Sequence, residues 1–119
     1  MSTSPDSVTG PLENYLDLLA QRQELIVGNM ANVDTPNYRT RDIDFERELR
    51  RAASGMEDQQ PQVIEVPGLV ERPDGNNVNM DREGLLLAQT QLEFRLGATL
   101  LRRRFQDLMN VIKEGSSSS

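Results

Sequence analysis

The segment from Met80 to Ile112 carries two rows of apolar residues that lie on opposite faces of one predicted long helix. Members of the first row recur at alternating spacings of four and three, the heptad pattern of a helix packed along a partner. The second row lies roughly opposite the first at about 100° per residue. The first row contains Met80, Gly84, Leu87, Gln91, Phe94, Ala98, Leu101, Phe105, Leu108 and Ile112, and the second contains Leu85, Leu92, Leu96 and Leu100.

One partner helix can cover only one of these two rows. In a chain of 119 residues the other row needs a neighbouring molecule. Leaving it in water would forgo several kcal/mol, because each fully buried Leu or Phe stabilises by roughly 1.5–3 kcal/mol. The two rows therefore predict assembly with other molecules rather than catalysis.

A partner helix is predicted near the N-terminus, where the same alternating spacing recurs. Pro11 suits a helix start, and Pro36 ends the pattern because proline forces Thr35 out of the helical region. Each of the two facing rows has one glutamine near its middle, Gln23 in the first helix and Gln91 in the second. These glutamines either fix the register of the two helices or lie at a poorly covered place. The row near the N-terminus contains Leu12, Leu16, Leu19, Gln23, Ile26, Met30 and Val33.

The patterns predict a mainly α protein whose two long terminal helices form a coiled-coil-like antiparallel pair. Residues 1–11 and 115–119 are expected to be disordered, and the helices are expected over 12–33 and 79–114. Residues 34–78 should form a turn and an irregular or β-hairpin middle segment. Within it, Asp44 should cap a short helix, and a strand at 62–66 should pair with 69–72.

The composition excludes several kinds of function. Cysteine and histidine are both absent, so the chain cannot build a disulfide, a thiolate nucleophile or a common zinc site. The net charge of -6 argues against nucleic acid as a partner, and no apolar run is long enough for membrane insertion. The loop from Asp74 lacks the glycine and the bidentate carboxylate of a calcium site. We therefore expect no enzyme activity, no metal and no cofactor.

Two motifs resemble those of the flagellar rod and hook axial proteins. The first has the form N-x-A-N-x-x-T-P-x-Y followed by charged residues and a phenylalanine, and the second precedes the C-terminal helix. The short spacing between the motifs is similar to that of the proximal rod subunits. The matching residues are Asn29, Ala31, Asn32, Thr35, Pro36, Tyr38, Asp42 and Phe45 in the first motif, and Asn77, Val78 and Glu83 in the second.

The resemblance implies a structural subunit of the bacterial flagellar basal-body rod that polymerises through its terminal helices into a drive shaft. The implied partners are other copies of the chain, other rod subunits, the adaptor protein at the rod base and the flagellar type III export apparatus. Export would proceed without a cleaved signal peptide, to the rod in the periplasmic space. The expected packing residues are Leu16, Leu19, Ile26, Leu87, Phe94, Leu101, Phe105 and Leu108 between helices, with Leu92, Leu96 and Leu100 toward other subunits.

Several interpretations remain open at the level of sequence. Asn29 and Pro36 either cap the first helix locally or contact another subunit, and Tyr38 and Phe45 pin the turn against the C-terminal helix or a neighbour. The alternative functions are a small acidic helical export chaperone and the sister short proximal rod subunit of the same family.

Overall fold

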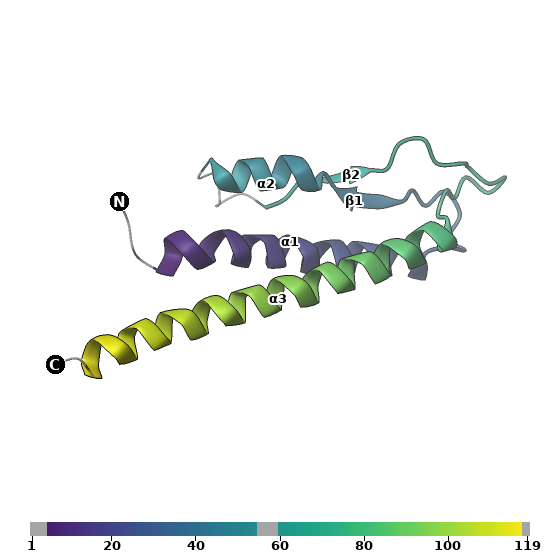
Figure 1. Ribbon diagram of the computed structural model, residues 1–119. Coiled ribbons are helices and arrows are strands. Elements are labelled where there is room, and N and C mark those ends of the chain that lie inside the picture. The colour runs from purple at the N-terminus through teal and green to yellow at the C-terminus, as the bar shows by residue number, and fades with distance from the viewer. Residues whose placement is uncertain (1–4, 55–59, 118–119) are drawn as a thin grey trace.

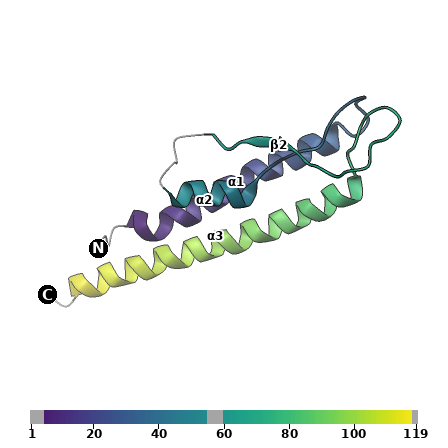
Figure 2. The ribbon, with the colours of Figure 1, turned by 90° about the horizontal axis from the view of Figure 1, so that it is seen from above.

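Two long antiparallel helices dominate the structure, a computed structural model that describes residues 5–54 and 60–117 (Figure 1). In chain order the elements are α1 (Pro5–Ala31), β1 (Arg41–Ile43), α2 (Phe45–Ala53), β2 (Val63–Glu65) and α3 (Met80–Ser117). α1 packs along α3, while α2 and the strands lie over α1 (Figures 1 and 2). The molecule is elongated, with extents of 73 × 26 × 17 Å. The predicted fold class is confirmed.

α1 begins earlier than predicted, and α3 ends later. α1 begins at Pro5 instead of residue 12 and includes Pro11. Proline has a helix-compatible φ, so it costs a hydrogen bond without forcing the helix to start there. α3 continues through Gly115 to Ser117, beyond the predicted end at 114. Glycine ends a helix when it adopts a left-handed conformation, and Gly115 does not. The termini expected to be disordered lie partly outside the described residues, at 1–4 and 118–119.

The best-covered residues of α3 lie beside the predicted apolar row, of which Leu87, Leu101 and Leu108 are half-buried. The fully covered residues are Glu83, Thr90 and Gly97, which recur every seven residues. The sequence pattern places Phe94 and Phe105 in the contact between the two helices (the seam), but their side chains retain 37% and 46% of their accessible surface. Hydrophobic periodicity cannot reveal a seam made of a carboxylate, a hydroxyl and a glycine.

Gly97 allows a close approach of the two helices. A methyl group at this position would lie 2.8 Å from Cδ2 of Leu16, well inside van der Waals contact. Two turns before Gly97, the buried hydroxyl of Thr90 donates a hydrogen bond to the carbonyl of Leu86 at 2.7 Å. On α1, the side chains of Leu19 and Ile26 are fully covered. Their burial and the position of Leu16 beside Gly97 are consistent with the packing expected of these three residues.

The two strands form one small antiparallel sheet, in which Asp42 is opposite Ile64. The predicted strand at 62–66 is therefore present in shorter form, but its expected partner, 69–72, is wrong. At the end of the ladder the amide of Val66 donates to the carbonyl of Thr40, which pairs the strand with β1. Pro67 has no amide hydrogen to donate, and Gly68 has a positive φ of 79°, so the chain turns away beyond the ladder.

α2 is fixed to the outer side of α1 by its first residue. Asp44 caps α2 as predicted, accepting from the amide of Arg47 at 3.3 Å. Phe45 packs edge-on against Tyr15 of α1, with 5.7 Å between ring centroids, and the guanidinium of Arg22 lies over the same ring. Phe45 thus pins the middle segment against the first helix, not against the C-terminal helix.

We predict that Gly97→Ala and Gly84→Ala affect stability differently. Alanine is favoured over glycine in a helix by about 1 kcal/mol. Position 84 has open space around an added methyl, whereas position 97 has Leu16. Gly84→Ala should therefore raise the free energy of unfolding, while Gly97→Ala should raise it less or lower it. Urea denaturation followed by circular dichroism measures both, and equal stabilisation by the two changes would contradict a close contact at Gly97.

Candidate functional site

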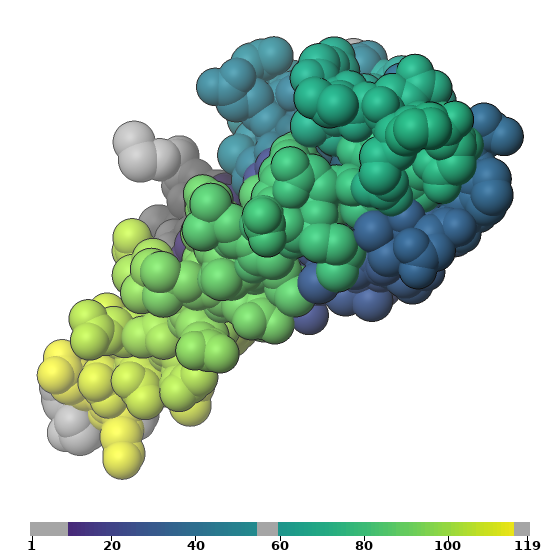
Figure 3. All heavy atoms as spheres, turned by 90° about the vertical axis from the view of Figure 1, so that its right-hand side faces the viewer, coloured from purple at the N-terminus to yellow at the C-terminus, as the bar shows by residue number. Residues whose placement is uncertain are grey.

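A cluster of buried polar side chains closes the end of the molecule where α1 stops and α3 begins. We call it the head network and define it as Asn29, Tyr38, Thr40, Asn76, Asn77 and Glu83. Figure 3 looks onto this end, where the segments around residues 30–45 and 60–80 crowd about the start of α3. All but Tyr38 have almost no exposed surface.

Asn29 is the centre of the head network. Its oxygen accepts from the backbone amide of Arg41 and from the hydroxyl of Tyr38, both at 3.0 Å. Its nitrogen donates to the carbonyl of Arg41 at 2.9 Å and to Glu83 Oε1 at 2.5 Å. The side chain thus pairs with both backbone groups of Arg41, as a residue of a neighbouring strand would. One amide joins α1, the turn, β1 and α3.

Asn76 and Asn77 hold the segment that leads into α3. The nitrogen of Asn76 donates to the carbonyls of Asn32 and Thr35, at 2.9 and 2.8 Å. The oxygen of Asn77 accepts from the amide and the hydroxyl of Thr40, at 2.7 and 2.9 Å. Asn76 thereby ties the segment before α3 to the turn that follows α1. The second motif begins at Asn77 in the sequence analysis, which therefore gave Asn76 no role.

Glu83 carries the buried carboxylate of the head network. Oε2 accepts from the guanidinium of Arg82 at 2.5 Å, while Oε1 accepts from Asn29. The residue also lies in the first turn of α3, where the helix dipole favours negative charge. Asn79 caps this helix by accepting from the amide of Arg82 at 3.0 Å. Because the charge is paired and hydrogen-bonded, its burial is tolerated.

Asn32, Thr35 and Pro36 of the first motif belong to the turn that follows α1. Asn32 caps α1 by donating to the carbonyl of Gly28 at 2.8 Å, and Thr35 donates to Asn32 at 3.0 Å. Ala31, Thr35 and Pro36 are exposed. Asn29 does not cap α1, so the local-capping interpretation is wrong for this residue and holds for Asn32.

Two arginines missed by the sequence analysis complete this end. Arg72 donates to the carbonyl of Val78 at 2.7 Å and also to the carbonyl of Val33, near the last turn of α1. Arg22 forms an ion pair with the buried Asp42 at 2.9 Å, which links α1 to β1. Neither arginine belongs to an apolar row or a motif, so nothing in the sequence marked them.

The head network has the chemistry of a structural joint. Its polar groups form hydrogen bonds with one another and with nearby backbone groups. Residues 5–54 and 60–117 contain no group of three or more carboxylates that could hold a metal ion. The helices of this part of the chain include none long and apolar enough to cross a membrane.

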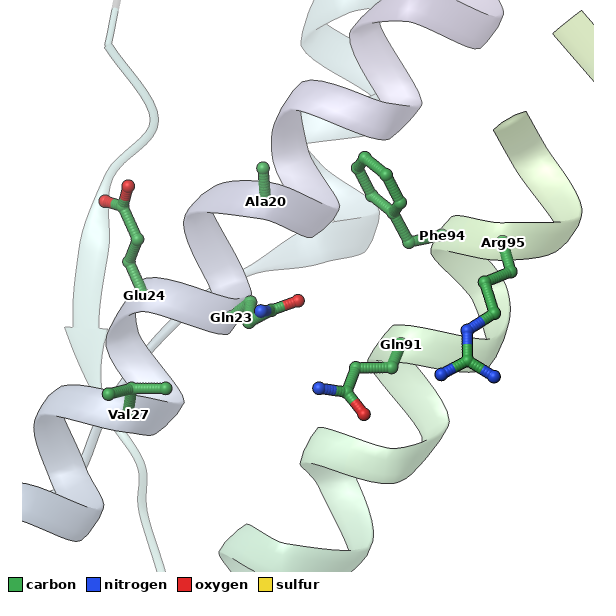
Figure 4. Close-up of a pocket in the computed structure, with 7 residues that line it drawn as sticks. All are labelled: Ala20, Gln23, Glu24, Val27, Gln91, Phe94 and Arg95. Atoms are coloured by element: carbon green, nitrogen blue, oxygen red, sulfur yellow. The ribbon is translucent and has the colours of Figure 1, made fainter.

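An open groove between α1 and α3 lies away from the head network and has a volume of about 700 Å³. Gln23 and Gln91, the two glutamines of the apolar rows, both point into it (Figure 4). They lie at a poorly covered place between the helices. The lining residues are Ala20, Gln23, Glu24, Val27, Gln91, Phe94 and Arg95.

Comparison with known proteins gives relatives that match almost end to end. The flagellar basal body rod protein FlgB of Salmonella typhimurium is 35% identical over 126 aligned residues, which cover 87% of this chain and 91% of the relative. FlgB of Escherichia coli is 32% identical with the same coverage. FlgB of Bacillus subtilis is 28% identical, covering 87% of this chain and 92% of the relative. No family model matches the chain.

The fold and these relatives together define a structural protein of the flagellar basal body rod. Within that class, the chain belongs to the FlgB family. The resemblance found in the sequence is confirmed, as is the expectation of a mainly helical rod protein.

We predict that Asn29→Asp disrupts the head network and that Glu83→Gln partly repairs it. The new carboxylate would face Glu83 and could not donate to it, and each buried group left unpaired costs about 1–3 kcal/mol. In the double variant the glutamine can donate to the aspartate, which restores one bond with reversed polarity. The free energies of unfolding from urea denaturation give the coupling between the two positions.

Asn110→Asp, on an exposed part of α3, is the control for added charge. Additive effects of the two head-network changes would contradict a direct contact between Asn29 and Glu83.

We also predict an alkaline loss of stability that depends on Tyr15. Burial raises the pKa of Tyr15 above its usual value, and the Glu93 carboxylate raises it further. The folded state therefore holds this proton more tightly. Its contribution is complete below the unfolded pKa and is lost as pH rises through the folded pKa. The unfolding free energy of Tyr15→Phe, measured by urea denaturation across this range, should fall less with pH than that of the wild type. Parallel curves would exclude the effect.

Proposed function

We propose that this rod protein is a proximal rod subunit that polymerises through α1 and α3 into a drive shaft that transmits torque. The observation that carries the proposal is the row of leucines on the outer side of α3. Leu85, Leu92, Leu96 and Leu100 all retain more than half of their accessible surface. The head network and the seam already position α3 without them, so these apolar side chains are available to other molecules.

The elongated shape supports the same proposal. α3 has 38 residues, and at 1.5 Å per residue it is about 57 Å long. An antiparallel pair of this length offers a long side face to neighbours, which suits a subunit that packs along a shaft. The exposed Met109, Val111 and Ile112 near the end of α3 extend the apolar surface.

We further propose that the chain is exported unfolded by the flagellar type III apparatus, without a cleaved signal peptide, and reaches the rod in the periplasmic space. The small apolar core supports this route. Among the described residues the buried hydrophobic side chains are Leu18, Leu19, Ile26, Ile43 and Val78. A core of this size opposes unfolding only weakly. The partners would be other copies, other rod subunits and the adaptor protein at the rod base.

The family assignment favours this function over the two alternatives. The relatives are rod proteins by name, which argues against a helical export chaperone. Their shared name FlgB likewise favours this subunit over the sister short rod protein.

Leu96→Asp tests the proposed assembly. The side chain is 57% exposed, so the charge should leave the isolated fold intact, while burying it between subunits would cost several kcal/mol. We expect normal expression and export but no rods, scored by motility and by electron microscopy of basal bodies. Gln106→Asp, an exposed position outside both apolar rows, should assemble normally. Normal basal bodies with Leu96→Asp would show that this leucine row is not a subunit contact.

A further inference from the structure

Apolar side chains line the groove between α1 and α3 together with Gln23 and Gln91, which point into it. Val27 on α1 and Phe94 on α3 retain 51% and 37% of their accessible surface, and Ala20 is also exposed. Glu24 and Arg95 lie at the edges (Figure 4). The groove faces away from α2 and the two strands. Arg22 contacts Asp42 of β1 and Phe45 of α2, and Val27, five residues later, is turned about 140° around α1 from Arg22.

The leucine row lies on a different side of α3 from the groove. Leu96 is five residues from Gln91, which lines the groove, and about 140° again separates the two positions. The molecule thus presents an apolar leucine row and a partly apolar groove that face in different directions. If the leucine row of one copy packs into the groove of another copy, the contact joins two unlike surfaces. Contacts of that kind repeat from copy to copy and build rings or helical filaments, whereas like-to-like contacts stop at a dimer.

Two charged side chains lie at matching places beside the leucine row and the groove. Arg103 continues the leucine row three residues after Leu100, and Glu24 lies three residues before Val27. Both charged side chains are exposed, and neither forms an ion pair with any other described residue. If α3 of one copy runs antiparallel to α1 of the next, Leu100 over Val27 brings Arg103 over Glu24. Acid and base then meet at the edge of the apolar contact.

We propose that the groove receives the leucine row of a second copy, with Leu100 on Val27 and Arg103 beside Glu24. This inference rests on the proposed function and names the contact by which one subunit would hold the next. The occupant is another copy of this chain because the chain itself carries the matching apolar row and the matching charge. Each copy would give its row to one neighbour and its groove to another.

The absence of cysteine from the chain makes the contact testable by disulfide linkage. Val27→Cys and Leu100→Cys would be introduced together in cells whose only copy is the variant, and purified basal bodies would be analysed without reductant. The two positions cannot link within one chain. Asn29 faces Glu83 and Leu16 faces Gly97, so position 100 lies about 20 Å along α3 from the part that faces Val27. A disulfide needs Cα atoms within about 7 Å.

We expect a ladder of dimers, trimers and longer products from the double variant, and no linkage from either single variant. Adding Glu24→Arg should abolish the ladder, and adding Arg103→Glu as well should restore it. Both substituted positions are about half exposed, so cysteine should leave the fold intact, which circular dichroism of the purified chain verifies.

Dimers from Leu100→Cys alone would show that leucine rows face each other, and would overturn the proposal. Variant chains present in basal bodies but never linked would overturn this contact while leaving the proposed function standing. A wild-type chain absent from purified basal bodies would overturn the proposed function, and this contact with it.

Discussion

The side-chain amide of Asn29 is the interaction on which the rest of the structure depends. Its four hydrogen bonds reach the turn after α1, both backbone groups of Arg41 in β1, and Glu83 in α3. A buried amide can satisfy its donors and acceptor in few arrangements, and each unpaired group costs free energy. One arrangement of the two long helices is therefore strongly preferred, although their apolar contact is small.

This distribution of contacts separates the interior of the subunit from its outer surface. Inside, polar groups pair with one another, and Gly97 lets α3 approach Leu16. Outside, the leucine row and the floor of the groove remain exposed. Contiguous exposed apolar side chains of this kind are typical of surfaces that contact other molecules. That property suits a rod protein of the FlgB family.

The sequence predicted the two long helices and their pairing because apolar periodicity reports which face of a helix is covered. It also marked most of the head network, since Asn29, Tyr38, Asn77 and Glu83 fall in recognisable motifs. The exact seam could not be predicted, because Thr90 and Gly97 carry no hydrophobic signal. Hydrogen bonds between distant segments, such as that from Asn76 to the end of α1, are set by tertiary structure and leave no local pattern. The pairing of β2 with β1 was missed for the same reason.

Hydrogen exchange at individual amides tests most directly whether side chains hold the head of the molecule together. The amides of Thr40, Arg41 and Val78 donate to the side chains of Asn77, Asn29 and Asn76. Nuclear magnetic resonance of the purified chain should find these three amides as strongly protected as those in the middle of α1, and far more protected than those near the end of α3. Exchange of the three amides as fast as at that end would contradict the account.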